Sequence, residues 1–109
     1  MKILFDQATP VPIRTYLQGH LVRTAAQQGW STLKNGDLLR AAEAAGFDLL
    51  LTTDRNVLYQ QNLSGRKIAI LVLDEQQWPK LRQKIQLVVD AVNAAAPGSY
   101  IEVEVRIKP

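Results

Sequence analysis

Residues 47–54, FDLLLTTD, decide the fold, because they form a continuous, mainly apolar run that ends at an acid, Asp54. A run without regular apolar–polar alternation is typical of a parallel strand that is covered on both faces. We therefore predict a central strand over residues 47–53, with Asp54 at its carboxyl end.

The segments around this run alternate between helical and strand patterns. Residues 37–45, DLLRAAEAA, predict a helix, because they are rich in Ala and Leu and are followed by Gly46. Two further apolar runs predict buried strands: KILF at residues 2–5, which ends at Asp6, and KIAILVL at residues 67–73. The other predicted elements are a short helix over residues 13–18, a strand over 20–24, a helix over 55–63, the longest helix over 78–96, and an alternating strand over 100–107 that lies at an edge or has a solvated face.

This alternation predicts an α/β domain of three layers, with a mainly parallel sheet of five strands and helices on both faces. Right-handed crossovers leave few topologies, and the order 2-1-3-4-5 is the common solution for five strands. A chain of 109 residues fits a single domain over residues 1–109. In the predicted order the first and third strands are neighbours, and the switch point of the sheet lies between them.

The composition excludes several classes of protein and of site. With 47% hydrophobic and 21% charged residues, the chain is neither disordered nor fibrous in composition, and no apolar run approaches the ~18 residues of a membrane span. The start, MKILFDQ, lacks the long apolar stretch of a signal peptide, so we expect a cytoplasmic protein without membrane contact. The net charge of +3 permits a polyanionic partner such as RNA.

The residue types available for metal binding are restricted. The chain has no Cys and a single His, His20, which excludes cysteine–zinc and histidine-rich sites. A metal site therefore has to use oxygen ligands, and oxygen ligands suit Mg²⁺ or Mn²⁺.

Two acids follow strands that the predicted order makes neighbours. Asp6 follows the first strand and Asp54 follows the third, so both lie at the switch point, where open α/β sheets bind ligands. Two carboxylates at short distance repel each other unless they share a cation or a proton. We therefore predict that Asp6 and Asp54 form the core of a site for a divalent ion, which lowers the pKa of a bound water and stabilises charge on a phosphate.

Asp37 is the candidate for a third acid, because it begins the helix before the third strand and so lies near the same rim. An Asp at this position also caps a helix or interacts with its dipole, and both interpretations stay open. Glu43 lies six residues further on, about 240° around the same helix, and is the reserve candidate.

Three segments carry a resemblance to a known family: ILFDQ at residues 3–7, LKNGDLLRAAEAAGFDLLLTTDRN at residues 33–56, and YQQNL at residues 59–63, which is followed by the strand KIAILVL. In these segments the chain resembles the short PIN-like proteins related to the PIN-domain ribonucleases. Several of those ribonucleases are toxins of bacterial toxin–antitoxin pairs. The resemblance covers roughly residues 1–75.

The resemblance implies metal-dependent hydrolysis of RNA phosphodiester bonds, with a protein antitoxin as a partner. By position, Asp6 matches the first-strand acid, Asp37 the mid-chain acid and Asp54 the acid of the TTD motif. As catalytic residues they would hold one or two Mg²⁺ or Mn²⁺ ions. Fuller PIN domains often have a further acid two residues after the TTD acid, where this chain has Asn56, an amide that supplies no charge.

Arg14, Arg55 and Asn56 are the predicted substrate-binding residues. The arginines, together with Lys34, can flank the acidic rim and contact phosphates, and Asn56 can ligate a metal or bond a phosphate. The ordinary interpretation of each cation is a solvated surface charge.

Two other functions compete with the nuclease. The absence of the further acid motivates a non-catalytic interaction module with the same fold. A phosphoacceptor receiver domain has the same size and strand order, but such domains have paired acids after the first strand, and this chain has the single acid Asp6 there. Receiver domains also have a Ser or Thr after the fourth strand, and this chain has Leu73 and Asp74 at that place.

The remaining predictions concern packing and assembly. Trp30 and Trp78 are predicted to be packing anchors, and His20 is predicted to have a structural role. The strict alternation of residues 100–107 predicts a strand edge that can pair with another chain, so a homodimer is expected.

Overall fold

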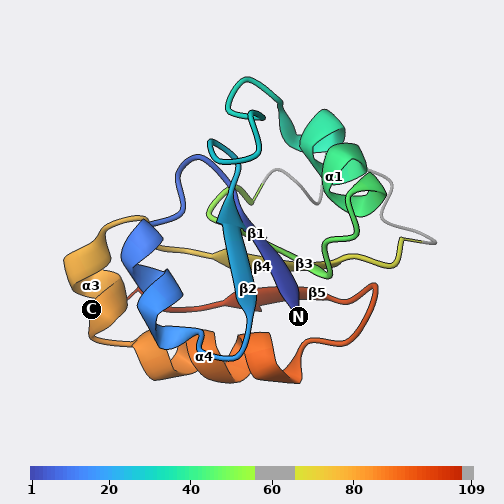
Figure 1. Ribbon diagram of the computed structural model, residues 1–109. Helices are drawn as coiled ribbons and strands as arrows, with labels where there is room; N and C mark the ends of the chain where they lie inside the picture. The colour runs from blue at the N-terminus through green and yellow to red at the C-terminus, as the bar shows by residue number, and fades with distance from the viewer. Residues whose placement is uncertain (56–65, 107–109) are drawn as a thin grey trace.

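The computed structural model describes residues 1–55 and 66–106, and these contain a sheet of five strands (Figure 1). The strand order is β2-β1-β3-β4-β5 and every neighbouring pair is parallel, so the predicted fold class and strand order are confirmed. The strands are β1 (Lys2–Phe5), β2 (Leu21–Thr24), β3 (Leu49–Thr52), β4 (Ala69–Leu73) and β5 (Tyr100–Val103).

Helices cover both faces of the sheet and complete the predicted three layers. Figure 1 shows α1 on one face, and the 3₁₀ helix η1 with α3 and α4 on the other. The helix predicted over residues 55–63 lies, apart from Arg55, outside the described residues. Within the described ranges, no helix combines the length and the apolar character needed to cross a membrane. The helices are η1 (Val11–Tyr16), α1 (Asn35–Ala44), α3 (Trp78–Arg82) and α4 (Ile85–Ala94).

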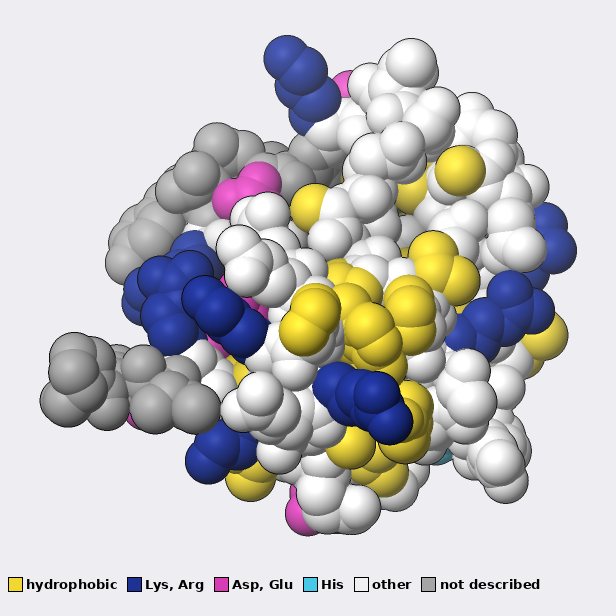
Figure 2. Space-filling model, turned by 90° about the vertical axis from the view of Figure 1, so that its left-hand side faces the viewer, with side chains coloured by type: hydrophobic (Ala, Val, Ile, Leu, Met, Phe, Trp, Pro, Cys, Tyr) yellow, Lys and Arg dark blue, Asp and Glu magenta, His cyan; other side chains and the backbone are white. Residues whose placement is uncertain are grey.

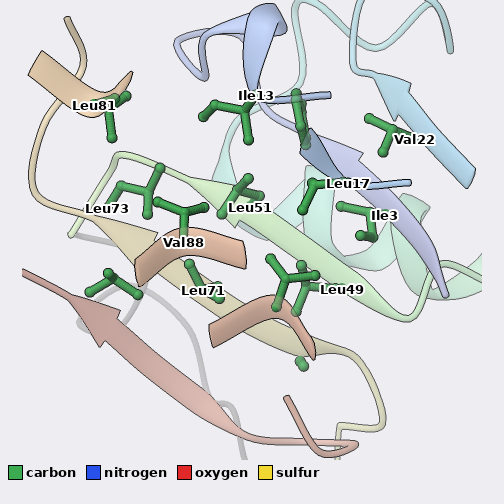
Figure 3. Packing of buried hydrophobic residues seen from close by; sticks show 14 of the residues in the cluster. Ile3, Ile13, Leu17, Val22, Leu49, Leu51, Leu71, Leu73, Leu81 and Val88 are labelled. Carbon is green, nitrogen blue, oxygen red and sulfur yellow. The ribbon is translucent and has the colours of Figure 1, made fainter. Parts of the chain in front are cut away.

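The central strands are buried on both faces. Successive side chains of a strand point to opposite sides of the sheet, so each strand contributes to two hydrophobic clusters. Along β3, Leu49 and Leu51 belong to one hydrophobic cluster and Leu50 belongs to the other. The cluster of Leu49 and Leu51 packs against η1, α3 and α4, and Figure 3 shows their side chains among those of the helices. The opposite cluster joins Leu50 to α1. The labelled members of the first cluster are Ile3, Ile13, Leu17, Val22, Leu49, Leu51, Leu71, Leu73, Leu81 and Val88.

The single long helix predicted over residues 78–96 is wrong, because the structure has two shorter helices there, α3 and α4. At the break, the N–H of Lys84 donates to the carbonyl of Leu81, three residues back rather than four, at 3.0 Å. No Gly or Pro occupies the break, so the sequence gives no local sign of it. The apolar pattern itself was informative, since Leu81, Val88 and Val92 are fully buried.

The predicted edge strand is confirmed in position, and it ends earlier than predicted. β5 lies at the edge of the sheet and stops at Val103. The reason is Asp74, whose carboxylate accepts the backbone N–H groups of Val105 (2.7 Å) and Arg106 (2.9 Å). These N–H groups therefore leave the strand ladder. Ile107, the last residue of the predicted strand, lies outside the described residues.

The side of the molecule that carries η1 and α3 exposes apolar side chains. Figure 2 shows a hydrophobic patch on this side, with Lys and Arg side chains around it. Val11 and Tyr16 of η1 are 51% and 39% exposed. The Tyr16 ring lies 5.8 Å from that of Trp78, between centroids, and Trp78 packs against the core, as predicted for an anchor.

Leu51→Ala is expected to destabilise the protein by about 2–5 kcal/mol, because Leu51 is fully buried at the centre of the sheet and its loss leaves a cavity. Leu87→Ala on α4 is the matched control, since Leu87 is 45% exposed, and its effect is expected to stay below about 1 kcal/mol. Urea unfolding followed by circular dichroism measures both. Equal losses of stability would contradict the two-sided burial of β3.

Candidate functional site

A pocket of about 560 Å³ lies at the carboxyl ends of the strands, where the strand order reverses between β1 and β3. Asp6 directly follows β1 and Asp54 lies two residues after β3, and both line this pocket. The structure therefore brings the two predicted strand-end acids to one place. We call it the switch-point pocket, and its other lining residues are Gln7, Ala8, Ala25, Trp30, Ser31, Leu33, Lys34, Leu38, Thr53, Arg55 and Gln76.

The hydroxyl of Thr52 connects the two acids. Thr52 is the last residue of β3 and is 1% exposed. Its Oγ1 donates a hydrogen bond to Oδ2 of Asp6 and accepts one from the backbone N–H of Asp54, at 3.1 Å. One buried side chain thus fixes the carboxylate of Asp6 and the backbone of Asp54 relative to each other.

Thr9 holds the other oxygen of the Asp6 carboxylate. The backbone N–H of Thr9 donates to Oδ1 of Asp6 at 3.1 Å. The Thr9 hydroxyl lies 2.5 Å from the same Oδ1 and 2.9 Å from the carbonyl oxygen of Leu51. A hydroxyl has one proton, so it donates to one of these two acceptors at a time. Asp6 is therefore oriented from both sides before any ligand binds.

Two cationic side chains line the pocket beside the acids. Lys34 precedes α1, and Arg55 follows Asp54 directly. Arg55 also forms an ion pair with Glu102 of β5 at 3.5 Å, and its side chain is 67% exposed. Arg55 thus lies in the lining of the pocket beside Asp54, and its role in substrate binding stays a prediction. The pocket thus combines anionic groups at its strand ends with cationic groups at its margins.

Asp37 does not join the switch-point pocket. It lies in the first turn of α1, its side chain is 63% exposed, and it forms an ion pair with Arg40. On α1 the residue that lines the pocket is Leu38, and Asp37 points about 100° away from it around the helix. The reserve candidate Glu43 lies outside the pocket as well and pairs with Arg66 at 3.4 Å.

The two remaining predicted site residues do not reach the described pocket. Arg14 lies on η1, is exposed and is not among the residues that line the pocket. Asn56 lies outside the described residues. His20 has hydrogen-bond partners that fit a structural role: its ring lies 3.1 Å from the amino terminus of Met1 and 2.9 Å from Oδ1 of Asn93.

The donor set of the pocket fits a hard divalent cation held by few protein ligands. Over residues 1–55 and 66–106, no group of three or more Asp, Glu or His side chains is placed to hold a metal ion, so the predicted three-carboxylate centre is not seen there. Mg²⁺ is usually bound by one or two carboxylates together with waters and substrate phosphates. Asp6 and Asp54 are the residues that would hold such an ion.

A smaller pocket of about 330 Å³ adjoins the switch-point pocket and shares Thr53, Arg55 and Gln76 with it. It extends over the ends of β4 and β5, so the two pockets form one surface along the carboxyl edge of the sheet. Two of its three acids have partners within the fold: Asp74 accepts two backbone N–H groups, and Glu102 pairs with Arg55.

The turn after β4 is fixed by a buried acid, Glu75, which is 4% exposed. The backbone N–H of Gln77 (3.1 Å) is the main reason that the pKa of Glu75 lies below its ordinary value of 4.5. Burial opposes this shift, and the N–H of Gln76 (2.9 Å) and the charges of Lys80 and Arg106 reinforce it. This turn places Gln76, which lines both pockets.

Sequence reasoning missed the two threonines that orient Asp6. Thr52 was visible as the first Thr of the TTD segment, and a hydroxyl at the end of a buried strand has to find a partner. Thr9 lies three residues after Asp6, so their contact is local, but its second partner, the carbonyl of Leu51, is brought near only when β1 and β3 pair.

Thr52→Val is expected to destabilise the protein by about 1–2 kcal/mol, because the isosteric change removes the hydroxyl that bonds Asp6 and Asp54. Thr53→Val is the control, since Thr53 is only half-buried, and its effect is expected within about 0.5 kcal/mol. Urea unfolding measures both variants. If the two changes cost the same, Thr52 does not connect the acids as described.

Glu75→Gln is expected to remove part of the acid sensitivity of the fold. A carboxyl with a lowered pKa in the folded protein stabilises it above the unfolded pKa, near 4.5, and this contribution is lost as the pH falls through the folded pKa. The difference in melting temperature between parent and variant should therefore be largest above pH 4.5 and shrink below it. Thermal melts between pH 7 and pH 3 test this, and a difference that grows on acidification contradicts it.

Comparison with protein-family models, with curated proteins and with solved structures finds no match to this chain. The assignment of the switch-point pocket therefore depends on its residues and their geometry. The likeness to short PIN-like proteins stays a resemblance carried by the sequence segments described above.

Proposed function

We propose that this chain is a metal-dependent ribonuclease that hydrolyses RNA phosphodiester bonds at the switch-point pocket. The observation that carries the proposal is that Asp6 and Asp54 line one pocket at the ends of neighbouring strands, where the Thr52 hydroxyl bonds the carboxylate of Asp6 and the backbone N–H of Asp54. Lys34 and Arg55 line the same pocket. A site for phosphate chemistry needs both kinds of group, anions that hold a cation and cations that contact phosphate oxygens.

The residues of the pocket have separate tasks in this reaction. Asp6 and Asp54 hold an Mg²⁺ or Mn²⁺ ion, which, when bound, lowers the pKa of a water and neutralises charge on the phosphate. Thr52 and Thr9 keep the Asp6 carboxylate in one orientation, so binding the ion requires little rearrangement of that side chain. Lys34 and Arg55 contact the phosphate oxygens of the RNA.

The shape of the carboxyl edge suits a chain-like substrate. The two pockets share Thr53, Arg55 and Gln76, so a strand that occupies the switch-point pocket can continue toward β5. Arg106 lines the second pocket and is the further cation available to the RNA backbone there. The net charge of +3 is compatible with this partner.

The second candidate function is a non-catalytic interaction module with the same fold. It is favoured by one observation, that Asp37 lies away from the pocket, which leaves two carboxylates among the described lining residues. A role as the toxin of a toxin–antitoxin pair, with a protein antitoxin as partner, rests on the sequence resemblance. The homodimer stays a prediction of the edge strand.

Calorimetric titration of Mn²⁺ into the parent protein is expected to show binding. Incubation of the Mn²⁺-loaded parent with mixed RNA is then expected to show cleavage. Asp54→Asn and Asp6→Asn are expected to lower both metal affinity and cleavage by about 100-fold or more, because each removes half of the carboxylate charge in the pocket. The melting temperature of Asp54→Asn is expected to equal or slightly exceed that of the parent, since repulsion between the acids is relieved. The melting temperature of Asp6→Asn is expected to fall, because an amide nitrogen replaces one of the two oxygens that accept hydrogen bonds from Thr9 and Thr52.

Asp90→Asn is the control, because Asp90 is exposed on α4, away from the pocket-lining residues, and the variant should behave as the parent. If Asp54→Asn cleaves as fast as the parent, the site assignment is wrong. Absence of both metal binding and cleavage in the parent favours the interaction module.

A further inference from the structure

Trp30 is placed at the pocket by the segment between β2 and α1. Its backbone N–H donates to the carbonyl of Ala25 at 2.8 Å, and its carbonyl accepts the N–H of Leu33 at 3.0 Å. Ala25 is 2% exposed and follows β2 directly, so the backbone of Trp30 is anchored to the sheet. The position of the indole therefore follows from the fold.

The indole ring has two environments. Its centroid lies 6.0 Å from that of Phe47, in an edge-to-face arrangement with an angle of 69°, and Phe47 is 4% exposed. This contact confirms Trp30 as a packing residue and restricts the motion of the ring. Yet Trp30 is only half-buried, and it lines the switch-point pocket together with Asp6 and Asp54.

The lining of the pocket changes character across the sheet. Following the strand order, Ala25 lies after β2, Asp6 after β1, Asp54 after β3 and Gln76 after β4. Trp30 therefore lies on the β2 side of the pocket, and Leu33 and Leu38 add apolar surface to the same wall. One wall of the pocket is aromatic and aliphatic, whereas the strand ends beside it are acidic.

Lys34 belongs to the same segment as the apolar wall and also lines the pocket. An aromatic ring with a neighbouring cation is the combination with which proteins bind single-stranded nucleic acids: the ring stacks on a base and the cation contacts the backbone. The pocket volume of about 560 Å³ lies within the ~300–1,000 Å³ usual for sites that enclose small groups, so a base has room.

We propose that Trp30 forms a base subsite of the switch-point pocket, where its indole stacks on an unpaired base next to the phosphate at the metal site that Asp6 and Asp54 would form. This inference rests on the proposed function and adds to it the residue that positions a base of the substrate. The bases of a duplex already stack on each other, and they present no face to a side chain unless the duplex opens. Trp30 is thus a substrate-positioning residue in addition to its packing role.

The chain has two tryptophans, which makes the test specific. Trp78 packs against Tyr16 and does not line the switch-point pocket, so Trp78→Phe leaves Trp30 as the sole indole fluorophore. In this background, with Asp6 and Asp54 unchanged and Ca²⁺ in place of Mn²⁺ to slow cleavage while the phosphate site is kept, a single-stranded RNA octamer is titrated and the fluorescence is recorded. We expect the Trp30 emission to be quenched by the single strand and little changed by the same sequence as a duplex.

Two substitutions separate stacking from packing. Trp30→Leu is expected to weaken binding of the octamer about tenfold, the size usual for loss of one stacked base, and Trp30→Phe is expected to retain most of it. Melting temperatures of both variants show whether the fold is kept. A DNA octamer tests whether the base subsite is shared by both kinds of single strand.

The outcomes distinguish the inference from the proposed function. If the parent cleaves RNA and Trp30→Leu binds and cleaves as the parent does, the stacking inference is wrong and the nuclease stands. If the octamer quenches Trp30 but the parent neither binds Mn²⁺ nor cleaves, the base subsite stands and the nuclease is wrong. Equal binding of single strand and duplex, or no binding of either, overturns the inference.

Discussion

Burial of β3 on both faces is the constraint from which the arrangement of this protein follows. Leu49 and Leu51 face η1, α3 and α4, and Leu50 faces α1, so the chain has to supply a helical layer to each side. β1 and β4 flank β3 in parallel, which places the carboxyl ends of all three strands at one edge. Polar residues that follow these strands therefore meet there, although they are far apart in sequence.

The polar groups at that edge are organised by the same burial. Thr52 is almost inaccessible, and a hydroxyl in such a place needs hydrogen-bond partners, which it finds in Asp6 and in the backbone of Asp54. Thr9, 4% exposed, completes the environment of Asp6. The pair of acids is consequently held by residues that belong to the packing of the sheet, which is the arrangement expected of a preorganised site.

The chemical character of the switch-point pocket differs from that of its neighbour. In the pocket over β4 and β5, Asp74 terminates the edge strand and Glu102 pairs with Arg55, so these acids have structural tasks. In the switch-point pocket the acids stand between an apolar wall that includes Trp30 and a margin that includes Arg55. Carboxylates and cations around one cavity are the groups on which the proposed RNA hydrolysis depends, and the aromatic ring is the group on which the proposed base subsite depends.

The sequence by itself determined the fold class, the strand order and the meeting of Asp6 and Asp54. Strand burial and strand–helix alternation are local patterns, and the handedness of parallel crossovers then leaves few topologies. The tertiary structure alone decided where side chains point and where helices break. Asp37 turns away because the face of α1 toward the pocket is set by packing, and the break before α4 has no local sequence cause. Likewise, only pairing of β1 with β3 brings Thr9 to Leu51, since a contact between distant segments depends on register rather than on either segment's own pattern.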